Sequence, residues 1–249
     1  MSRYFSEAVF RPGSPADARE LALLNGDVDM QHKALWRLFS CPPGTPRPFL
    51  YRQRIDEAAS GDRGARFWLL SDAPPQAPDA RWQVRTKRYA PRFRNGQRLR
   101  FELRIAPSVS RVDPRRPTPP GKRVPPSTRF DPVALALMAL PESQRADERR
   151  RWIDGKLALW LRDKAVRCGF TWPDADDVTL VRYEPATQAR SRRENVRFSV
   201  ADFSGTLEVT DIDAFTAAAL QGVGHQRGFG CGLLLLKPAR ERDDEDGDD

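Results

Sequence analysis

Two histidines, His32 and His225, are the only side chains here that titrate near neutral pH without perturbation, so they are the first candidates for proton transfer. His32 lies in a segment with helical spacing, at the border between the apolar face and a flank that carries cations. A histidine placed there can meet a phosphate while its ring packs on other side chains, as acid–base chemistry on a phosphodiester requires. An interface or surface histidine fits the same pattern, so the residues alone leave both interpretations open.

The glycine-rich segment 222–232 is the second candidate site, with five glycines in eleven residues between a predicted helix and a predicted strand. Glycines let a backbone approach a ligand closely, so N–H groups here can meet phosphate oxygens while Arg227 neutralises them. It is not a Walker loop, because GxxxxGKS/T is absent and the order is helix, loop, strand. A tight turn is the alternative, and His225 within it reads as a solvent-facing residue. The glycines assigned to binding are Gly222, Gly224, Gly230 and Gly232.

Motifs for metals and for other nucleophiles are absent. HExxH, paired Cys/His ligands and GxSxG do not occur, and Cys41, Cys168 and Cys231 are odd in number and widely spaced. We therefore expect reduced thiols, no metal site and no cofactor. Hydrolysis of RNA is feasible without a metal, because the 2′-OH is a built-in nucleophile that needs a positioned acid–base group and cations around the phosphate.

The charge of the chain is uneven. The formal net charge is +8, but Arg240–Asp249 carries two arginines and seven acids, which leaves +13 on residues 1–239. A basic body attracts polyanions, of which nucleic acid is the commonest. Only six of the 42 cations are lysines, so an arginine-rich composition from a GC-rich genome is the alternative explanation.

Neither a membrane span nor a secretion signal is predicted. The longest apolar run, Val133–Leu140, has eight residues, whereas a bilayer needs about 20. The N-terminus lacks an apolar region followed by a small-residue cleavage site. We expect a cytoplasmic protein without a membrane partner.

The elements that must position these residues repeat one order twice. Strands are predicted at 3–10, 49–55, 65–71 and 83–89, with helices at 17–24 and 29–39, and a loop at 72–80 takes the place of a second helix. A strand at 98–105, a helix at 148–166, strands at 178–183 and 196–209, a helix at 211–220 and an apolar run at 233–236 give the order again. Seven prolines in residues 107–126 predict a basic loop without regular structure.

This order, β-α-β-β-α-β, is the split βαβ pattern. It predicts an α+β protein of two tandem ferredoxin-like (RRM-like) domains, the first with a degraded second helix. We expect residues 1–94 to form the domain that carries the catalytic helix. Residues 98–238 would form the domain with the glycine-rich segment and a basic hairpin, and residues 239–249 a disordered acidic tail.

Six segments share residues with the motifs of one family. They are Gln31–Phe39, Thr86–Lys87, Phe101–Pro107, Gly121–Arg123, Phe203–Val209 and Gly222–Leu234. The last is the most specific, because it meets the pattern GhGxxK/RxxGxGLL with Arg227 at the basic position. Ser204 and Ala106 depart from the family's Glu and Asn. On these motifs the chain resembles the CasE family of CRISPR RNA endoribonucleases, the processing subunit of the type I-E Cascade complex.

The resemblance implies an activity and a catalytic set. The repeat hairpin of CRISPR precursor RNA would be cut at its 3′ base by attack of the 2′-OH, which leaves a 2′,3′-cyclic phosphate, and the product would stay bound beside the other Cascade subunits. His32 would be the general acid or base, with Lys33 beside it. Family members often have Tyr where Asp29 stands, and Tyr4 in the first strand is the candidate phenol instead.

RNA binding is expected to come from arginines on a loop that resembles the family's basic hairpin. Because the major groove of A-form RNA is deep and narrow, such side chains would grip phosphates more than they read bases. A solvated charged loop is the alternative. The binding residues predicted beside the glycines are Arg190, Arg192, Arg193, Arg197, Arg227, Lys87, Lys122 and Arg123.

Two other functions fit the same fold and charge. One is a non-catalytic subunit that binds an RNA hairpin, which the Asp29 departure favours. The other is a structural subunit that docks on protein. Cleavage of a repeat transcript in EDTA separates the first from an enzyme, and a hairpin affinity that falls steeply with salt argues against the second.

Overall fold

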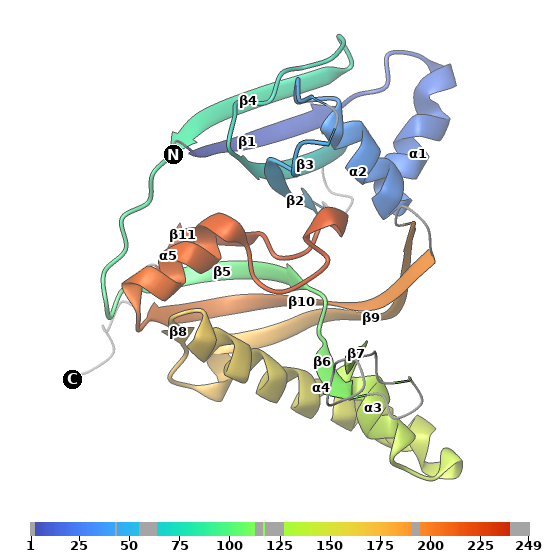
Figure 1. The fold of residues 1–249 in the computed structure, drawn as a ribbon, viewed down its shortest axis with the longest axis vertical. Helices are drawn as coiled ribbons and strands as arrows, with labels where there is room; N and C mark the ends of the chain where they lie inside the picture. Colours follow the sequence, from blue (N-terminus) through green and yellow to red (C-terminus); the bar gives the residue numbers. More distant parts are fainter. Residues whose placement is uncertain are drawn as a thin grey trace, which may run out of the picture.

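A computed structural model describes residues 3–42, 44–54, 64–112, 117, 127–190 and 195–239 (Figure 1). The predicted binding residues Arg192, Arg193, Lys122 and Arg123, and the acidic segment 240–249, lie outside these ranges. Within them, no helix is long and apolar enough to cross a membrane, and the three cysteines are free.

The first sheet contains β1 (Arg3–Phe10), β2 (Phe49–Arg54), β3 (Ala65–Ser71) and β4 (Trp82–Tyr89) in the antiparallel order β2-β3-β1-β4. Between β1 and β2 lie a 3-10 turn, η1 (Pro15–Asp17), and the helices α1 (Ala18–Gly26) and α2 (Val28–Trp36). No helix joins β3 to β4, because three prolines in residues 72–80 cannot supply the N–H groups that a helix needs. The predicted loss of the second helix is confirmed.

The second sheet repeats the strand order of the first. Its strands are β5 (Arg98–Ile105), β8 (Phe170–Thr171), β9 (Val178–Arg190), β10 (Asn195–Val209) and β11 (Leu234–Pro238). The order is β11-β5-β10-β8, and β9 also pairs with β10. The helices are α3 (Pro132–Met138), α4 (Glu142–Arg167) and α5 (Ile212–Gln221). The 3-10 turn η2 (Ala175–Asp177) lies between β8 and β9, and η3 (Arg227–Phe229) lies between α5 and β11. Both sheets have the ferredoxin-like arrangement, and the α+β prediction is confirmed.

One prediction for the proline-rich segment is wrong. β6 (Val109–Val112) pairs with β7 (Ser127–Phe130), so regular structure does occur within residues 107–126. The reason is the spacing of the prolines, which leaves residues 108–113 free of them and able to form a short ladder.

We call β1–β4 with α1 and α2 the first unit, and β5–β11 with α3–α5 the second unit; the break between them lies between β4 and β5. That these units are the separate domains 1–94 and 98–238 stays a prediction. Each sheet buries one face under its own helices, around Phe67 and Leu35 in the first unit and Phe101 and Phe215 in the second.

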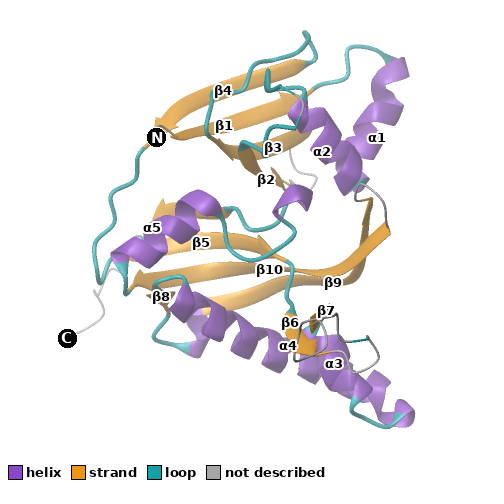
Figure 2. Cartoon of the chain, viewed as in Figure 1, coloured by secondary structure: helices purple, strands orange, loops and turns teal. Residues whose placement is uncertain are grey.

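The units meet through apolar residues on the other face of the first sheet. Leu50 and Leu70 pack there with Leu233, and Phe5, Trp68 and Leu235 surround them. The helices α1 and α2 cover the opposite face of the first sheet, α2 also contacts η3 and β9 of the second unit, and α4 runs along the second sheet (Figure 2). The free face of the first sheet is thus closed by Leu233, directly after the glycine-rich segment, and by β11.

Candidate nuclease site

The helix α2 holds His32 at the junction of the two units. Asp27 caps this helix, since its side chain accepts hydrogen bonds from the N–H groups of Asp29 and Met30. The buried face of α2 is formed by Gln31, Ala34 and Leu35, which leaves His32 half-buried at its border, as the sequence predicts. The turn η3 of the second unit packs against α2 and β2 beside it.

Three aromatic rings surround the imidazole of His32. The ring centroids of Trp36, Phe49 and Phe229 lie 6.2, 6.3 and 6.1 Å from its own. Phe229 belongs to the glycine-rich segment, whereas the other two belong to the first unit. His32 and the glycine-rich segment, separated by about two hundred residues, are therefore neighbours in space, as both predictions of a site require.

The hydrogen bonds of His32 fix where its proton lies. The indole Nε1–H of Trp36 donates to Nε2 at 3.0 Å, so the neutral ring carries its proton on Nδ1. Nδ1 is buried, and among the described residues it makes no hydrogen bond of good geometry, although the backbone of Gly228 lies close enough to favour a proton on the ring. Burial lowers the pKa of His32 below its ordinary value of 6.5, and Arg47 lowers it further, against smaller opposing effects of the Gly228 backbone and Asp29. The imidazole is thus mostly neutral at pH 7.

The ammonium of Lys33 is held in an ion pair with Asp29 on the same helix. Its Nζ lies 2.8 Å from Oδ2 of Asp29, one turn back on the same helix. Asp29, which stands where the family often has Tyr, is therefore paired with Lys33. A direct role for Lys33 in catalysis stays a prediction, and this ion pair must open for the ammonium to meet a phosphate.

Tyr4 lies away from this cluster. It pairs with Ser71 of β3, which in turn pairs with Phe49 of β2, so two strand spacings, about 10 Å, separate Tyr4 from the phenylalanine that contacts His32. No interaction joins Tyr4 to His32 among the described residues. Its role as the catalytic phenol stays a prediction.

Arg47 is a residue of this site that the sequence analysis missed. It lies between Pro46 and Pro48, and its Nε donates to the carbonyl of Phe49 at 2.6 Å. Its Nη1 lies 2.8 Å from the point where a Cβ on Gly228 would stand, and that point is 3.9 Å from Cε1 of His32. Arg47 belongs to the site only because the start of β2 packs against the glycine-rich segment, and no motif in the sequence indicates this contact.

The glycine-rich segment is braced from within. Arg227 donates from Nε to the carbonyl of Gly224 at 2.9 Å and from Nη1 to that of Gln221 at 2.7 Å. The N–H of Gly232 donates to the backbone carbonyl of Arg104 in β5 at 2.7 Å, which ties the segment to the sheet. The arginine expected to neutralise a phosphate thus also holds the loop in shape.

Two glycines let this segment press against the first unit. Gly222 and Gly230 have φ of 83° and 77°, which favours glycine. A Cβ on Gly222 would stand 2.9 Å from Leu50, and one on Gly230 would stand 3.3 Å from Tyr51. These glycines are needed for packing between the units, whereas RNA binding by Gly222, Gly224, Gly230 and Gly232 stays a prediction. His225 is exposed, as expected, and bridges to Ala106.

The predicted basic hairpin is formed by β9 and β10, whose arms extend as far as the pair Arg190 and Asn195. Its end approaches α2, so it lies on the same side of the molecule as His32 (Figure 1). Arg197 on β10 is exposed, and Lys87 on β4 is exposed beside the ring of Phe5, 5.8 Å from its centroid. The structure places β9 of the hairpin against α2, the helix that carries His32, whereas Lys87 lies on the edge strand of the first sheet.

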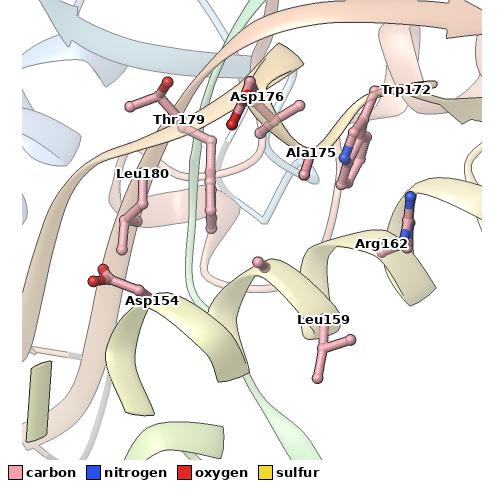
Figure 3. A pocket seen from close by; sticks show the side chains of 11 residues that line it. Asp154, Leu159, Arg162, Trp172, Ala175, Asp176, Thr179 and Leu180 are labelled. Atoms are coloured by element: carbon pink, nitrogen blue, oxygen red, sulfur yellow. The ribbon is translucent and has the colours of Figure 1, made fainter. Parts of the chain in front are cut away.

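A separate pocket of about 540 Å³ lies between α4 and β9 (Figure 3). Leu159, Trp172 and Leu180 are among its lining residues, and none of the predicted site residues is. It is not part of the His32 site.

Comparisons with known proteins agree with this architecture. The curated CRISPR system Cascade subunit CasE of Escherichia coli (strain K12) is 24% identical over 212 residues, which cover 85% of this chain and 92% of that protein. A Thermus thermophilus Cse3 structure, bound to an RNA representing a pre-cleavage complex, superposes with a TM-score of 0.63 at 22% identity and covers 96% of this chain and 100% of that one. Cas6e from Escherichia coli K-12 gives a TM-score of 0.57 at 22% identity, over 95% of this chain and 100% of its own.

The resemblance to the CasE proteins is therefore confirmed, and the two-unit fold is shared with the solved structures. A model of the family described as CRISPR associated protein matches residues 3–238, nearly the whole described chain. The chain belongs to this CRISPR associated protein family.

Proposed function

We propose that this protein is an endoribonuclease of CRISPR RNA processing. It binds the repeat hairpin of the precursor, cuts at the 3′ base of that hairpin, and stays on the mature guide RNA as a subunit of a Cascade complex. Supporting this, its relatives are a Cascade subunit CasE and a Cse3 bound to RNA before cleavage. The basic hairpin of β9 and β10 supplies a surface for the RNA backbone beside α2.

The observation that carries the proposal is the position of His32. Its ring is half-buried where the two units meet, and its Nδ1 makes no hydrogen bond of good geometry among the described residues. A buried polar atom left unsatisfied costs free energy unless a water or a ligand completes it. The guanidinium of Arg47 lies near the same face of Gly228 as the imidazole and adds positive charge where a phosphate would lie.

The reaction that these residues support is transesterification within the RNA. The 2′-oxygen forms a bond to the adjacent phosphorus, the bond from phosphorus to the 5′-oxygen breaks, and a 2′,3′-cyclic phosphate and a 5′-OH result. One proton leaves the 2′-OH and one arrives at the 5′-oxygen, and His32 transfers one of them. Since the nucleophile is part of the substrate, no step requires a metal ion.

Cleavage of a repeat transcript in EDTA tests the proposal. We expect wild type to give one 5′ fragment that ends in a cyclic phosphate, and His32→Ala to bind the hairpin equally well but to cleave about 10²- to 10⁴-fold more slowly. His225→Ala is the matched control, because it removes the other, exposed histidine. Cleavage by His32→Ala at the wild-type rate would contradict the role of His32.

A second function is favoured by two contacts around His32. Trp36 occupies Nε2 of His32, so this nitrogen is not free to accept a proton, and Lys33 is paired with Asp29, so its ammonium is not free to meet a phosphate in this geometry. These contacts suit a subunit that binds the hairpin without cutting it. That function holds if wild type and His32→Ala bind the transcript alike and both leave it intact.

A further inference from the structure

The arginine Arg47 stands out among the charged side chains at the junction. Its Nε is fixed by the carbonyl of Phe49, and flanking prolines restrict the backbone on both sides. The side chain is half-buried. Its free end therefore has a defined direction, toward Gly228 and the imidazole of His32.

No carboxylate pairs with this guanidinium within the described part of the chain. Among the ionisable groups, Tyr51 and Arg227 act on the pKa of Arg47. Tyr51 is fully buried, and burial raises the pKa of its phenol far above neutral pH, so it brings no negative charge. Arg227 adds a second positive charge, and Asp29 on α2 is already paired with Lys33.

The guanidinium of Arg47 lies 5.9 Å from the ring centroid of Phe49, a cation–π contact that offsets only part of the cost of burying a cation without a counter-charge. A ligand that offsets the rest must be an anion, and it must reach the space that Arg47, His32 and Gly228 share. A guanidinium recognises phosphate oxygens with two parallel N–H donors. Gly228 keeps this space open, because any Cβ at that position would meet Nη1 of Arg47 at 2.8 Å.

We propose that Arg47 is a catalytic residue that donates hydrogen bonds to a non-bridging oxygen of the scissile phosphate. This inference rests on the proposed endoribonuclease function. During the attack of the 2′-oxygen the phosphoryl group gains negative charge, and a fixed guanidinium stabilises that charge more than it stabilises the bound substrate. Arg47 transfers no proton, so His32 remains the acid–base group.

Single-turnover cleavage of the repeat hairpin by Arg47→Ala and Arg47→Lys tests this assignment. We expect Arg47→Ala to lower the rate by about 10²- to 10³-fold, as when an oxyanion donor is lost. Arg47→Lys keeps the positive charge but loses the paired N–H donors of the guanidinium, so its cleavage rate should lie between those of wild type and Arg47→Ala. Affinity for a 2′-deoxy, uncleavable hairpin should fall much less than the rate. Arg150→Ala, an exposed arginine on α4, controls for the loss of one charge.

Sulfur substitution at each non-bridging oxygen of the scissile phosphate shows whether Arg47 touches it. In wild type one diastereomer should react more slowly than the other, because sulfur accepts a hydrogen bond poorly. In Arg47→Ala this difference should vanish. An unchanged preference would place Arg47 away from the phosphate and overturn the assignment, and Arg47→Lys provides the same comparison if the alanine variant does not fold.

The outcomes separate the two proposals. Wild type that binds but never cleaves overturns the endoribonuclease function and the catalytic role of Arg47 with it. If His32→Ala is inactive while Arg47→Ala cleaves at the wild-type rate, the enzyme stands and only the role of Arg47 is lost.

Discussion

Two arginines five residues apart, Arg47 and Arg52, enter the same junction and meet opposite surroundings. Nη2 of Arg52 lies 3.5 Å from Oδ1 of Asp202 and 3.7 Å from Oε2 of Glu102, and Arg104 reaches Asp202 at 2.9 Å. Arg47 has no such carboxylate among the described residues. One end of the junction is thus a closed cluster of paired charges, and the other is a set of cations that lacks an anion.

The difference separates charges that serve the fold from charges that serve a ligand. Burial raises the pKa of Asp202, and Arg104 and Arg52 oppose that effect, so the paired cluster gains little free energy beyond the cost of desolvation. Removing one member leaves the others buried and uncompensated. In the protein without RNA the charge of Arg47 has no counter-ion, and a bound phosphate supplies one.

The largest effect on stability is expected from Asp202→Ala. Asp202 is about 10% exposed and contacts two guanidinium groups, so its loss should lower the free energy of unfolding by about 3 to 5 kcal/mol. Arg47→Ala should lower it by only about 1 kcal/mol, because one hydrogen bond to the Phe49 carbonyl is lost and no ion pair is broken. Urea unfolding of the two variants measures both. A larger loss in Arg47→Ala than in Asp202→Ala would reverse the comparison.

Much of the fold could be predicted from the sequence, because strand alternation and proline clusters are local signals. They indicated the repeated strand order and the missing helix in residues 72–80. The short ladder of β6 and β7 was missed, since four residues carry too little pattern against seven prolines nearby.

The candidate site could be predicted only in part. The border position of His32 follows from helical spacing within one segment. The proximity of Arg47, His32 and Gly228 depends on packing between the two units, which no local pattern reports. The direction of a side chain is likewise invisible in sequence, so the bracing of the loop by Arg227 was not foreseen.

Gly228→Ala should perturb only the end of the junction that holds Arg47, and not the ion-pair cluster around Asp202. The added Cβ would approach Nη1 of Arg47 to 2.8 Å, and this flexible atom can yield at little cost to the fold. We expect cleavage to fall by about tenfold, or about 1.4 kcal/mol in activation free energy, with an almost unchanged unfolding curve. Gly155→Ala on α4 is the matched control, because its Cβ would meet nothing within 4 Å and should stabilise the helix by about 1 kcal/mol. A Gly228→Ala enzyme that cleaves like wild type would argue that Arg47 does not need this space.

Trp36→Phe should give the smallest change, a shift in the titration of His32. The indole N–H stabilises the neutral ring through Nε2, and burial and Arg47 already lower its pKa below 6.5. Phenylalanine keeps the ring packing but removes the donor, so the pKa of His32 should rise toward its ordinary value. The limb of the pH–rate profile that belongs to His32 then moves to higher pH. If His32 is the base, this is the acidic limb, because protonation inactivates the ring; if it is the acid, this is the alkaline limb. NMR titration of the imidazole provides an independent measure, and an unchanged pKa would show that the Trp36 contact does not control the proton of His32.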